Sequence, residues 1–258
     1  MISLSSTELN AWLAAYFFPL ARILALLAAA PPFYYTALPR RVRLMLGLAI
    51  TIAIVPALGT PFPAPPSSGQ GLLILAEQLL IGFAMGFSMR LAFSAIDLAG
   101  NIISFQMGLG FATSYDPSNA SQTPVISELI AVLGLLLFLA IDGHLMVIST
   151  LVQSFRALPV GTLPGRDSWM NIAQAGGIIF SSGLLLTLPI IVALLITNTA
   201  LGVLGRVAPQ LNLIVIGFPI TITLGFTTLY VTLPYLNVPL MRLFETGLQA
   251  MLGNFVLK

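Results

Sequence analysis

Residues 168–205 read SWMNIAQAGGIIFSSGLLLTLPIIVALLITNTALGVLG, and these 38 residues contain no Asp, Glu, Lys or Arg. Residues 44–76 and 207–241 are also free of charged side chains. A membrane-spanning helix needs about 20 consecutive apolar residues, so each of these gaps is long enough to cross a bilayer. No soluble fold accounts for three such gaps in one chain. The sequence therefore predicts an integral membrane protein.

The composition of the whole chain supports this class. Of its 258 residues 58% are hydrophobic and only 7% are charged, whereas an ordinary soluble domain carries about 25% charged residues. So few charges argue against a soluble enzyme, a disordered tail and a nucleic-acid-binding protein. The absence of Cys excludes disulfides and thiolate sites, and the single His leaves little for a metal site. We therefore expect neither a metal nor a cofactor.

The hydrophobic residues divide into about six segments followed by a short amphipathic tail. Helices are expected in all of them, because a strand in lipid leaves its backbone groups unpaired. The Pro- and Gly-rich stretch 59–71 is expected to form a loop. The first ten residues lack Lys and Arg, so we expect no cleaved signal peptide. The predicted segments are 9–30, 42–58, 72–97 with a possible extension to 105, 124–155, 169–204 and 213–236, and the tail is 239–258.

The predicted segments do not fit a simple serpentine path through the membrane. Arg40–Arg43 would be cytoplasmic by the positive-inside rule, which then puts Arg156, Arg166 and Arg242 outside and contradicts itself. The fifth segment is too long for one span even when tilted, and it contains Pro189. These features favour helices packed together in an assembly over isolated lipid-facing rods.

A few polar side chains interrupt the apolar segments. Arg22 is interpreted either as a helix-end side chain that reaches the headgroups or as half of a buried pair with a carboxylate from another helix or from another subunit. Glu77 and Gln78 open the third segment, where an acid suits the helix dipole. Asp142 and His144 predict either a helix break at the glycine between them or, less plainly, a proton relay.

Two further polar stretches carry the candidate functional residues. In residues 100–124, two glycines loosen a loop bearing Met107, Leu109 and Phe111, which predicts either an ordinary re-entrant loop or a deformable seal in a pore. Residues 206–212 form a connector between helices or a polar contact between subunits. The sequence contains no motif of a hydrolase, a nucleotide-binding loop or a zinc protease, so we expect no enzyme activity.

Several short motifs, in this order and spacing, resemble the FliR/SctT family of type III export-gate proteins. The resemblance extends over nearly the whole chain, and the flagellar branch fits better than the injectisome branch. Asp142 departs from the pattern, since Asn is expected there in many relatives. The motifs are PLAR at 19–22, LPRRVR at 38–43, QMGLGFA at 106–112 with Asp116-Pro117, DGHL at 142–145, SFRALPVG at 154–161, GVLGRVAPQLN at 202–212 and IGFP at 216–219.

The resemblance implies one export-gate domain over residues 1–258, built of long, kinked helical hairpins in a helical assembly. It implies a flagellar export pore formed with FliP and FliQ, with FlhB at its entrance, through which unfolded flagellar proteins pass. The location implied is the inner membrane and flagellar basal body, in contact with lipid and extending to the periplasmic side. An injectisome export gate and a small-solute transporter are the alternatives.

The resemblance also implies roles for individual residues. A plug loop over about 106–122 would close the pore, and a second set of side chains would pack between subunits. The plug residues are Gln106, Met107, Gly108, Leu109, Gly110, Phe111, Asp116 and Pro117, and the packing residues are Arg22, Arg206, Pro209, Gln210 and Asn212.

Overall fold

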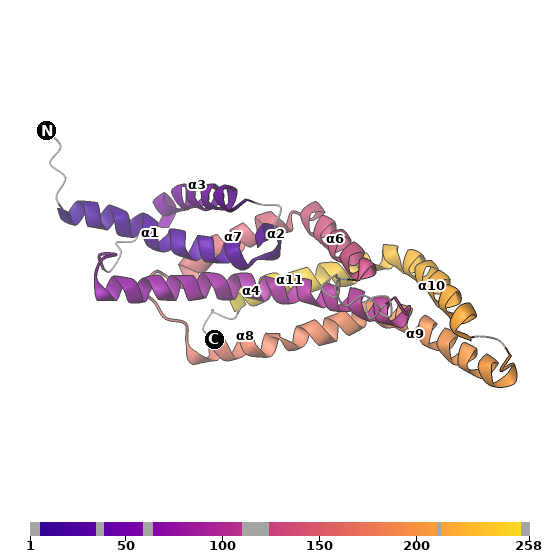
Figure 1. The fold of residues 1–258 in the computed structure, drawn as a ribbon. Helices are drawn as coiled ribbons and strands as arrows, with labels where there is room; N and C mark the ends of the chain where they lie inside the picture. The colour runs from indigo at the N-terminus through magenta and orange to yellow at the C-terminus, as the bar shows by residue number, and fades with distance from the viewer. Residues whose placement is uncertain (1–5, 35–38, 59–63, 110–123, 211–212, 254–258) are drawn as a thin grey trace, which may run out of the picture. The chain divides into compact units, whose positions relative to one another are not determined.

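All regular elements in the described part of the chain are helices. The structure is a computed structural model that describes residues 6–34, 39–58, 64–109, 124–210 and 213–253. No strand occurs in these ranges, so the predicted all-α class is confirmed. In chain order (Figure 1) the elements are α1 (Ser6–Ala29), α2 (Pro31–Tyr34), α3 (Arg40–Leu58), α4 (Gly69–Gln106), α6 (Val125–Ala140), α7 (Gly143–Ala157), α8 (Arg166–Ala175), α9 (Gly177–Val207), α10 (Leu213–Thr232), the 3₁₀ turn η2 (Leu233–Leu236) and α11 (Asn237–Gly253).

The element boundaries differ from the predicted ones in three places. Helix α4 starts at Gly69, inside the expected loop, because the Ser68 hydroxyl caps it by accepting a hydrogen bond of 3.0 Å from the Gly71 N–H. The fourth and fifth segments are each divided, into α6 with α7 and α8 with α9. Pro219 and Pro234 predict interruptions of the sixth segment; α10 continues through Pro219, whereas the 3₁₀ turn η2 contains Pro234. One proline removes one backbone donor, and the long apolar run on both sides keeps the helix intact.

Several helices are long and apolar enough to cross a membrane. Among the described residues there are five such helices, and a sixth span results if α6 and α7, which are separated by a sharp bend, are counted as one. The five are Asn10–Ala29, Arg40–Leu58, Gly69–Gln106, Arg166–Val207 and Ile216–Gly253. The protein is therefore an all-α membrane protein.

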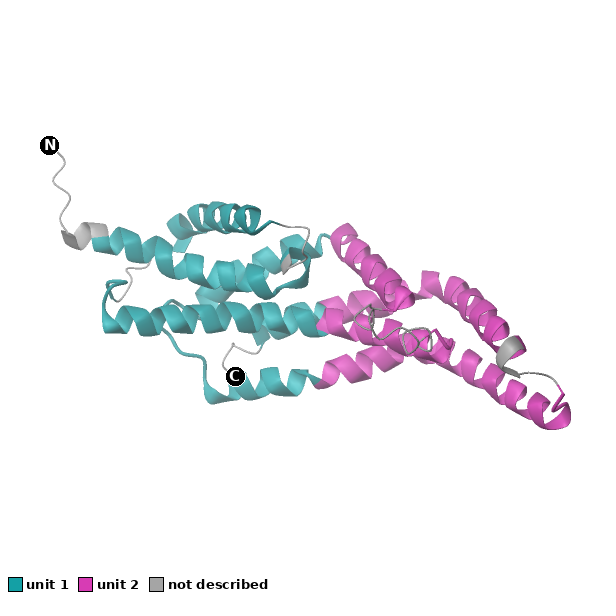
Figure 2. Ribbon diagram, in the orientation of Figure 1, with its two compact units in different colours: residues 1–91, 142–176, 245–258 teal, residues 92–141, 177–244 magenta. Residues whose placement is uncertain are grey.

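The chain forms two compact units that exchange segments (Figure 2). The first comprises residues 1–91, 142–176 and 245–258, and the second comprises 92–141 and 177–244. The chain passes between them within α4, between α6 and α7, between α8 and α9, and within α11. Apolar runs alone gave no sign of this division, and the expectation of one export-gate domain over residues 1–258 stays a prediction.

Glycines bring the helices of the first unit into close contact. Gly82 and Gly86 form a GxxxG pattern on α4, and a Cβ at Gly86 would lie 2.7 Å from the Cβ of Ala29 on α1. A Cβ at Gly82 would collide with the carbonyl oxygen of Arg22. Small residues at this spacing let two apolar helices approach backbone to backbone. The approach fixes Arg22 of α1 beside the first half of α4.

An aromatic cluster lies at the centre of the second unit. Phe93 of α4, Phe138 of α6 and Phe244 of α11 form a triangle with ring centroids 5.0 to 5.5 Å apart. Phe138 and Phe244 are fully buried. Edge-to-face contacts of this kind add to the free energy gained from burial alone. The cluster holds the second half of α4 in place, and that half leads to the predicted plug loop.

Candidate functional site

Arg22 is buried at the centre of a polar cluster in the first unit. Its side chain is 0% exposed. Its Nε donates to Oε1 of Gln78 at 2.8 Å, and one terminal nitrogen donates to the carbonyl and hydroxyl oxygens of Ser154 at 3.1 and 3.2 Å. The other terminal nitrogen donates to the carbonyl of Leu158 at 3.0 Å. The guanidinium carbon also lies 4.3 Å from the centre of the Phe155 ring.

These contacts tie the cluster to the end of α7. Ser154 belongs to the last turn of that helix and Leu158 is its C-cap, so a buried cation faces carbonyl oxygens at the negative end of the helix dipole. The headgroup-reaching interpretation of Arg22 is wrong because the side chain is buried. The carboxylate interpretation is also wrong for the described residues, where the acceptors are an amide, a hydroxyl and two carbonyls. The structure thus gives Arg22 an internal role and does not test the predicted contact with another subunit.

A second candidate site lies where α4 ends and the predicted plug loop begins. Gly108 has a φ of +83°, and its N–H donates to the carbonyl of Phe105 at 3.0 Å. The N–H of Leu109 donates to the carbonyl of Ser104, also at 3.0 Å. These two bonds make a Schellman motif, which needs glycine at the left-handed position. The direction in which the chain leaves α4 is therefore fixed by Gly108.

Met107 anchors this helix end to α10. Its side chain is 0% exposed and lies against Gly225, where an added Cβ would be 2.6 to 2.9 Å from three of its side-chain atoms. The Thr221 hydroxyl lies 3.3 Å from the carbonyl oxygen of Met107, to which it donates. The Phe218 ring packs beside Gly108, 3.1 Å from where a Cβ would lie. We call this arrangement, formed by these five residues of the second unit, the plug anchor.

The plug anchor covers only the first part of the predicted loop. Gln106 and Leu109 are half-buried, and Met107 packs on α10, so its predicted sealing role stays a prediction. The other predicted plug residues lie outside the described residues: Gly110, Phe111, Asp116 and Pro117.

The acid and histidine between α6 and α7 mark a backbone break. Asp142 has a φ of +56°, and its side chain is exposed and makes no capping hydrogen bond. We had expected the break at Gly143, but it lies one residue earlier, at Asp142. Asp and Asn adopt this left-handed conformation more readily than other non-glycine residues. His144 is half-buried, and its Nδ1 has no hydrogen-bond partner among the described residues.

The conformation of Asp142 leads to a test of its charge. Asp142→Asn should keep the folded yield and export activity at the wild-type level, because Asn tolerates positive φ and the side chain makes no capping bond. Asp142→Val should lower the midpoint of thermal unfolding, since a β-branched residue is strained at this φ by about 1–3 kcal/mol. A proton relay at this position predicts loss of export in both variants, because each of them removes the carboxylate. Export assays on both variants distinguish a purely conformational role of Asp142 from a proton relay.

The polar connector after α9 is open to contact. Arg206 closes the last turn of α9, and it is exposed, as are Pro209 and Gln210. Asn212 lies outside the described residues. In the described ranges, no three or more His, Asp or Glu side chains gather in a way that would hold a metal ion. The exposed side chains of the connector offer hydrogen bonds and one positive charge.

Several residues that the structure places at these sites were not predicted from the sequence. Gln78 and Ser154 were not recognised as partners of Arg22, and Gly225 was not recognised as the seat of Met107. The GxxxG pattern at Gly82 and Gly86 was a readable signal for the packing of α4 on α1. No local pattern marks Gly225, because its partner is far away in the sequence.

Comparison with known proteins gives a consistent picture over most of the chain. Residues 13–247 match the family model described as bacterial export proteins, family 1. The chain is 45% identical over 236 residues to the flagellar biosynthetic protein FliR of Pectobacterium carotovorum subsp. carotovorum, covering 91% of this chain and 90% of that protein. It is 44% identical over 235 residues to FliR of Escherichia coli K12, with 91% and 90% covered. It is 27% identical over 244 residues to FliR of Bacillus subtilis 168, with 92% and 93% covered.

Proposed function

Because this chain belongs to the bacterial export proteins, family 1, we propose that it is a subunit of the flagellar type III export gate. Its similarity to FliR proteins of several bacteria, at up to 45% identity and over about nine-tenths of both chains, carries this proposal. The five helices capable of crossing a membrane support a location in the membrane. A role in export rather than catalysis agrees with the described polar sites, which are clusters of hydrogen bonds and exposed connectors.

The proposed role includes a plug that closes the pore at rest. The loop over about 106–122 leaves α4 at a fixed angle, set by Gly108, and its first apolar residue, Met107, is held by α10. A loop with a rigid base and apolar residues beyond it suits a seal that an entering polypeptide displaces. The second half of α4, α10 and the aromatic cluster form the support for that base.

The proposed partners are FliP and FliQ, which complete the pore, and FlhB at its entrance. The proposed location is the inner membrane within the flagellar basal body, with part of the assembly on the periplasmic side. In the most apolar 18-residue stretch of α3, only 17% is buried within the chain. A surface so apolar needs lipid or another subunit to cover it. Besides FliP, FliQ and FlhB, the exported flagellar proteins are proposed to contact this chain transiently as they pass.

Co-purification tests the proposed assembly. We expect this chain, expressed with FliP and FliQ, to be recovered in a defined hetero-oligomer. Arg206→Ala should lower the recovered hetero-oligomer several-fold, because Arg206 is exposed at the end of α9 beside the polar connector. Arg166→Ala, which removes an exposed arginine at the start of α8, is the matched control and should leave the yield unchanged. Recovery of a monomer that transports a small solute would refute the export-gate role.

A further inference from the structure

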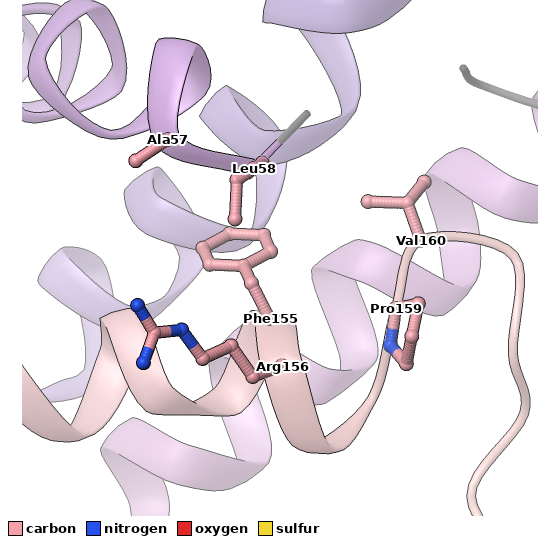
Figure 3. Close-up of a pocket in the computed structure, with 6 residues that line it drawn as sticks. All are labelled: Ala57, Leu58, Phe155, Arg156, Pro159 and Val160. Carbon is pink, nitrogen blue, oxygen red and sulfur yellow. The ribbon is translucent and has the colours of Figure 1, made fainter. Parts of the chain in front are cut away.

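A cavity of about 290 Å³ opens in the first unit where two candidate membrane helices end. It is lined by Ala57 and Leu58, the last residues of α3, and by Phe155, Arg156, Pro159 and Val160 at and after the end of α7. Figure 3 shows the Phe155 ring pointing toward Leu58, with Pro159 and Val160 on the turn that follows. Among the described lining residues, Arg156 alone has a charged or polar side chain. We call this cavity the α3–α7 pocket.

Among the described residues that line the pocket, Arg156 is positively charged and none is acidic. Arg156 is exposed, and no described residue is its hydrogen-bond or ion-pair partner. Behind the Phe155 ring lies the buried guanidinium of Arg22, 4.3 Å from the ring centre. The hydrogen-bond acceptors of Arg22 are all neutral, so its charge is not cancelled by a carboxylate. An anionic group at the mouth of the pocket would form a charge-assisted hydrogen bond with Arg156, and this outweighs the weaker repulsion from the negative C-terminal ends of α3 and α7.

The pocket lies at the C-terminal end of α3, and this position sets its depth in a membrane that α3 crosses. This helix has 19 residues and is therefore about 28 Å long at 1.5 Å per residue, close to the thickness of the hydrocarbon core. Its arginines at 40, 41 and 43 would lie at one membrane surface, which places Leu58 at the other. The exposed apolar side chains of α3 connect the two ends: Val42, Leu44, Met45, Leu48 and Ile52. An apolar cavity with an arginine at this level matches a phosphate group above an acyl chain.

We propose that the α3–α7 pocket binds an anionic phospholipid, with the phosphate on Arg156 and the upper part of an acyl chain in the apolar cavity. A guanidinium can bind phosphate oxygens through two parallel N–H···O bonds, which an exposed and unpaired arginine is free to make. The lipid would cover the apolar lining between α3 and α7. This inference needs only that α3 and α7 lie in a membrane, so it stands or falls separately from the role in flagellar export.

Lipid retention by the purified full-length protein tests this proposal. The protein in detergent is titrated with phosphatidylglycerol or phosphatidylcholine, and retained lipid is measured by native mass spectrometry. The wild type should retain phosphatidylglycerol about five- to tenfold more tightly than phosphatidylcholine, the preference expected for one charged contact. Arg156→Gln should remove this preference, and Arg156→Lys should keep part of it. Arg166→Gln, with the same loss of charge on α8, should not change it.

A second variant tests the apolar half of the pocket without altering charge. Ala57→Trp fills the cavity and should abolish retention of both lipids, while the thermal midpoint stays near that of the wild type. Equal retention of the two lipids by the wild type, or a preference that survives Arg156→Gln, would overturn the proposal. It would also be overturned if Arg156→Gln left lipid retention intact but reduced the recovery of the hetero-oligomer, because the pocket would then hold an acidic segment of a partner protein.

Discussion

Replacing Arg22 with alanine should cost this protein most of its folded yield. The change removes the donors of Gln78 Oε1 and of the Leu158 carbonyl, and it opens a cavity beside Phe155. The Ser154 carbonyl keeps its hydrogen bond from the Leu158 N–H. A single orphaned buried acceptor costs about 1–3 kcal/mol, and a core cavity adds to this. We therefore expect a loss of at least about 3 kcal/mol of folding free energy. Thermal unfolding in detergent, with the yield of monodisperse protein, measures the effect.

A lysine at this position separates charge from geometry. Arg22→Lys keeps the buried cation, but one ammonium cannot reach acceptors on α4 and on the end of α7 in the way that the forked guanidinium does. We expect Arg22→Lys to be nearly as harmful as Arg22→Ala. Arg41→Ala removes an exposed arginine of α3 and should leave the midpoint within error of the wild type. If Arg22→Ala unfolds at the wild-type temperature, the cluster does not stabilise the fold.

The hydrophobic segments were predictable because long apolar runs depend only on local composition. The all-α class and the approximate position of every long helix followed from them. The start of α4 was misplaced by a few residues because the capping role of Ser68 was overlooked. The break at Asp142 was nearly found, since an Asp-Gly pair marks a turn, but which residue takes the positive φ depends on the helices on either side.

The partners at the candidate sites were not predictable, because they are distant in the sequence. Arg22 and Gln78 are 56 residues apart, and Arg22 and Leu158 are 136 apart. Thr221 and Met107 are 114 apart. Residue types at such separations give no periodic signal, so the neutral acceptors of Arg22 were not predicted and Met107 was assigned only a sealing role. Their actual contacts follow from how closely the helices approach, which glycines such as Gly82 and Gly225 set.

Adding one methyl group to the plug anchor should make the assembled gate leak. In Gly225→Ala the new Cβ would lie 2.6 Å from Cγ of Met107 and within 3 Å of its Sδ and Cε. Because the overlap runs along the whole side chain, Met107 has to leave its seat. Overpacking a core in this way costs about 1–3 kcal/mol, which corresponds to about a 5- to 150-fold rise in the population with a displaced loop base.

Conductance of the co-assembled gate in planar bilayers measures this rise, normalised to the amount of complex recovered. Deletion of residues 107–112 and Phe111→Ala should both increase the leak, because they remove the predicted seal itself. If neither the leak nor export responds to the deletion, the loop is not a gate, and the effect of Gly225→Ala is then one of stability alone.

A second glycine of α10 provides the matched control for this change. At Gly217 an added Cβ would meet only a Leu201 methyl group at 3.6 Å, an ordinary van der Waals distance. Gly217→Ala and Gly225→Ala change the same helix by the same group and raise its helix propensity equally, so any difference between them reports the contact with Met107. Met107→Ala removes the side chain that packs against Gly225, so the complex that carries this variant should also leak. If Gly217→Ala and Gly225→Ala conduct alike, the anchor on α10 does not hold the plug, and the loop must be held by residues beyond Leu109 or by another subunit.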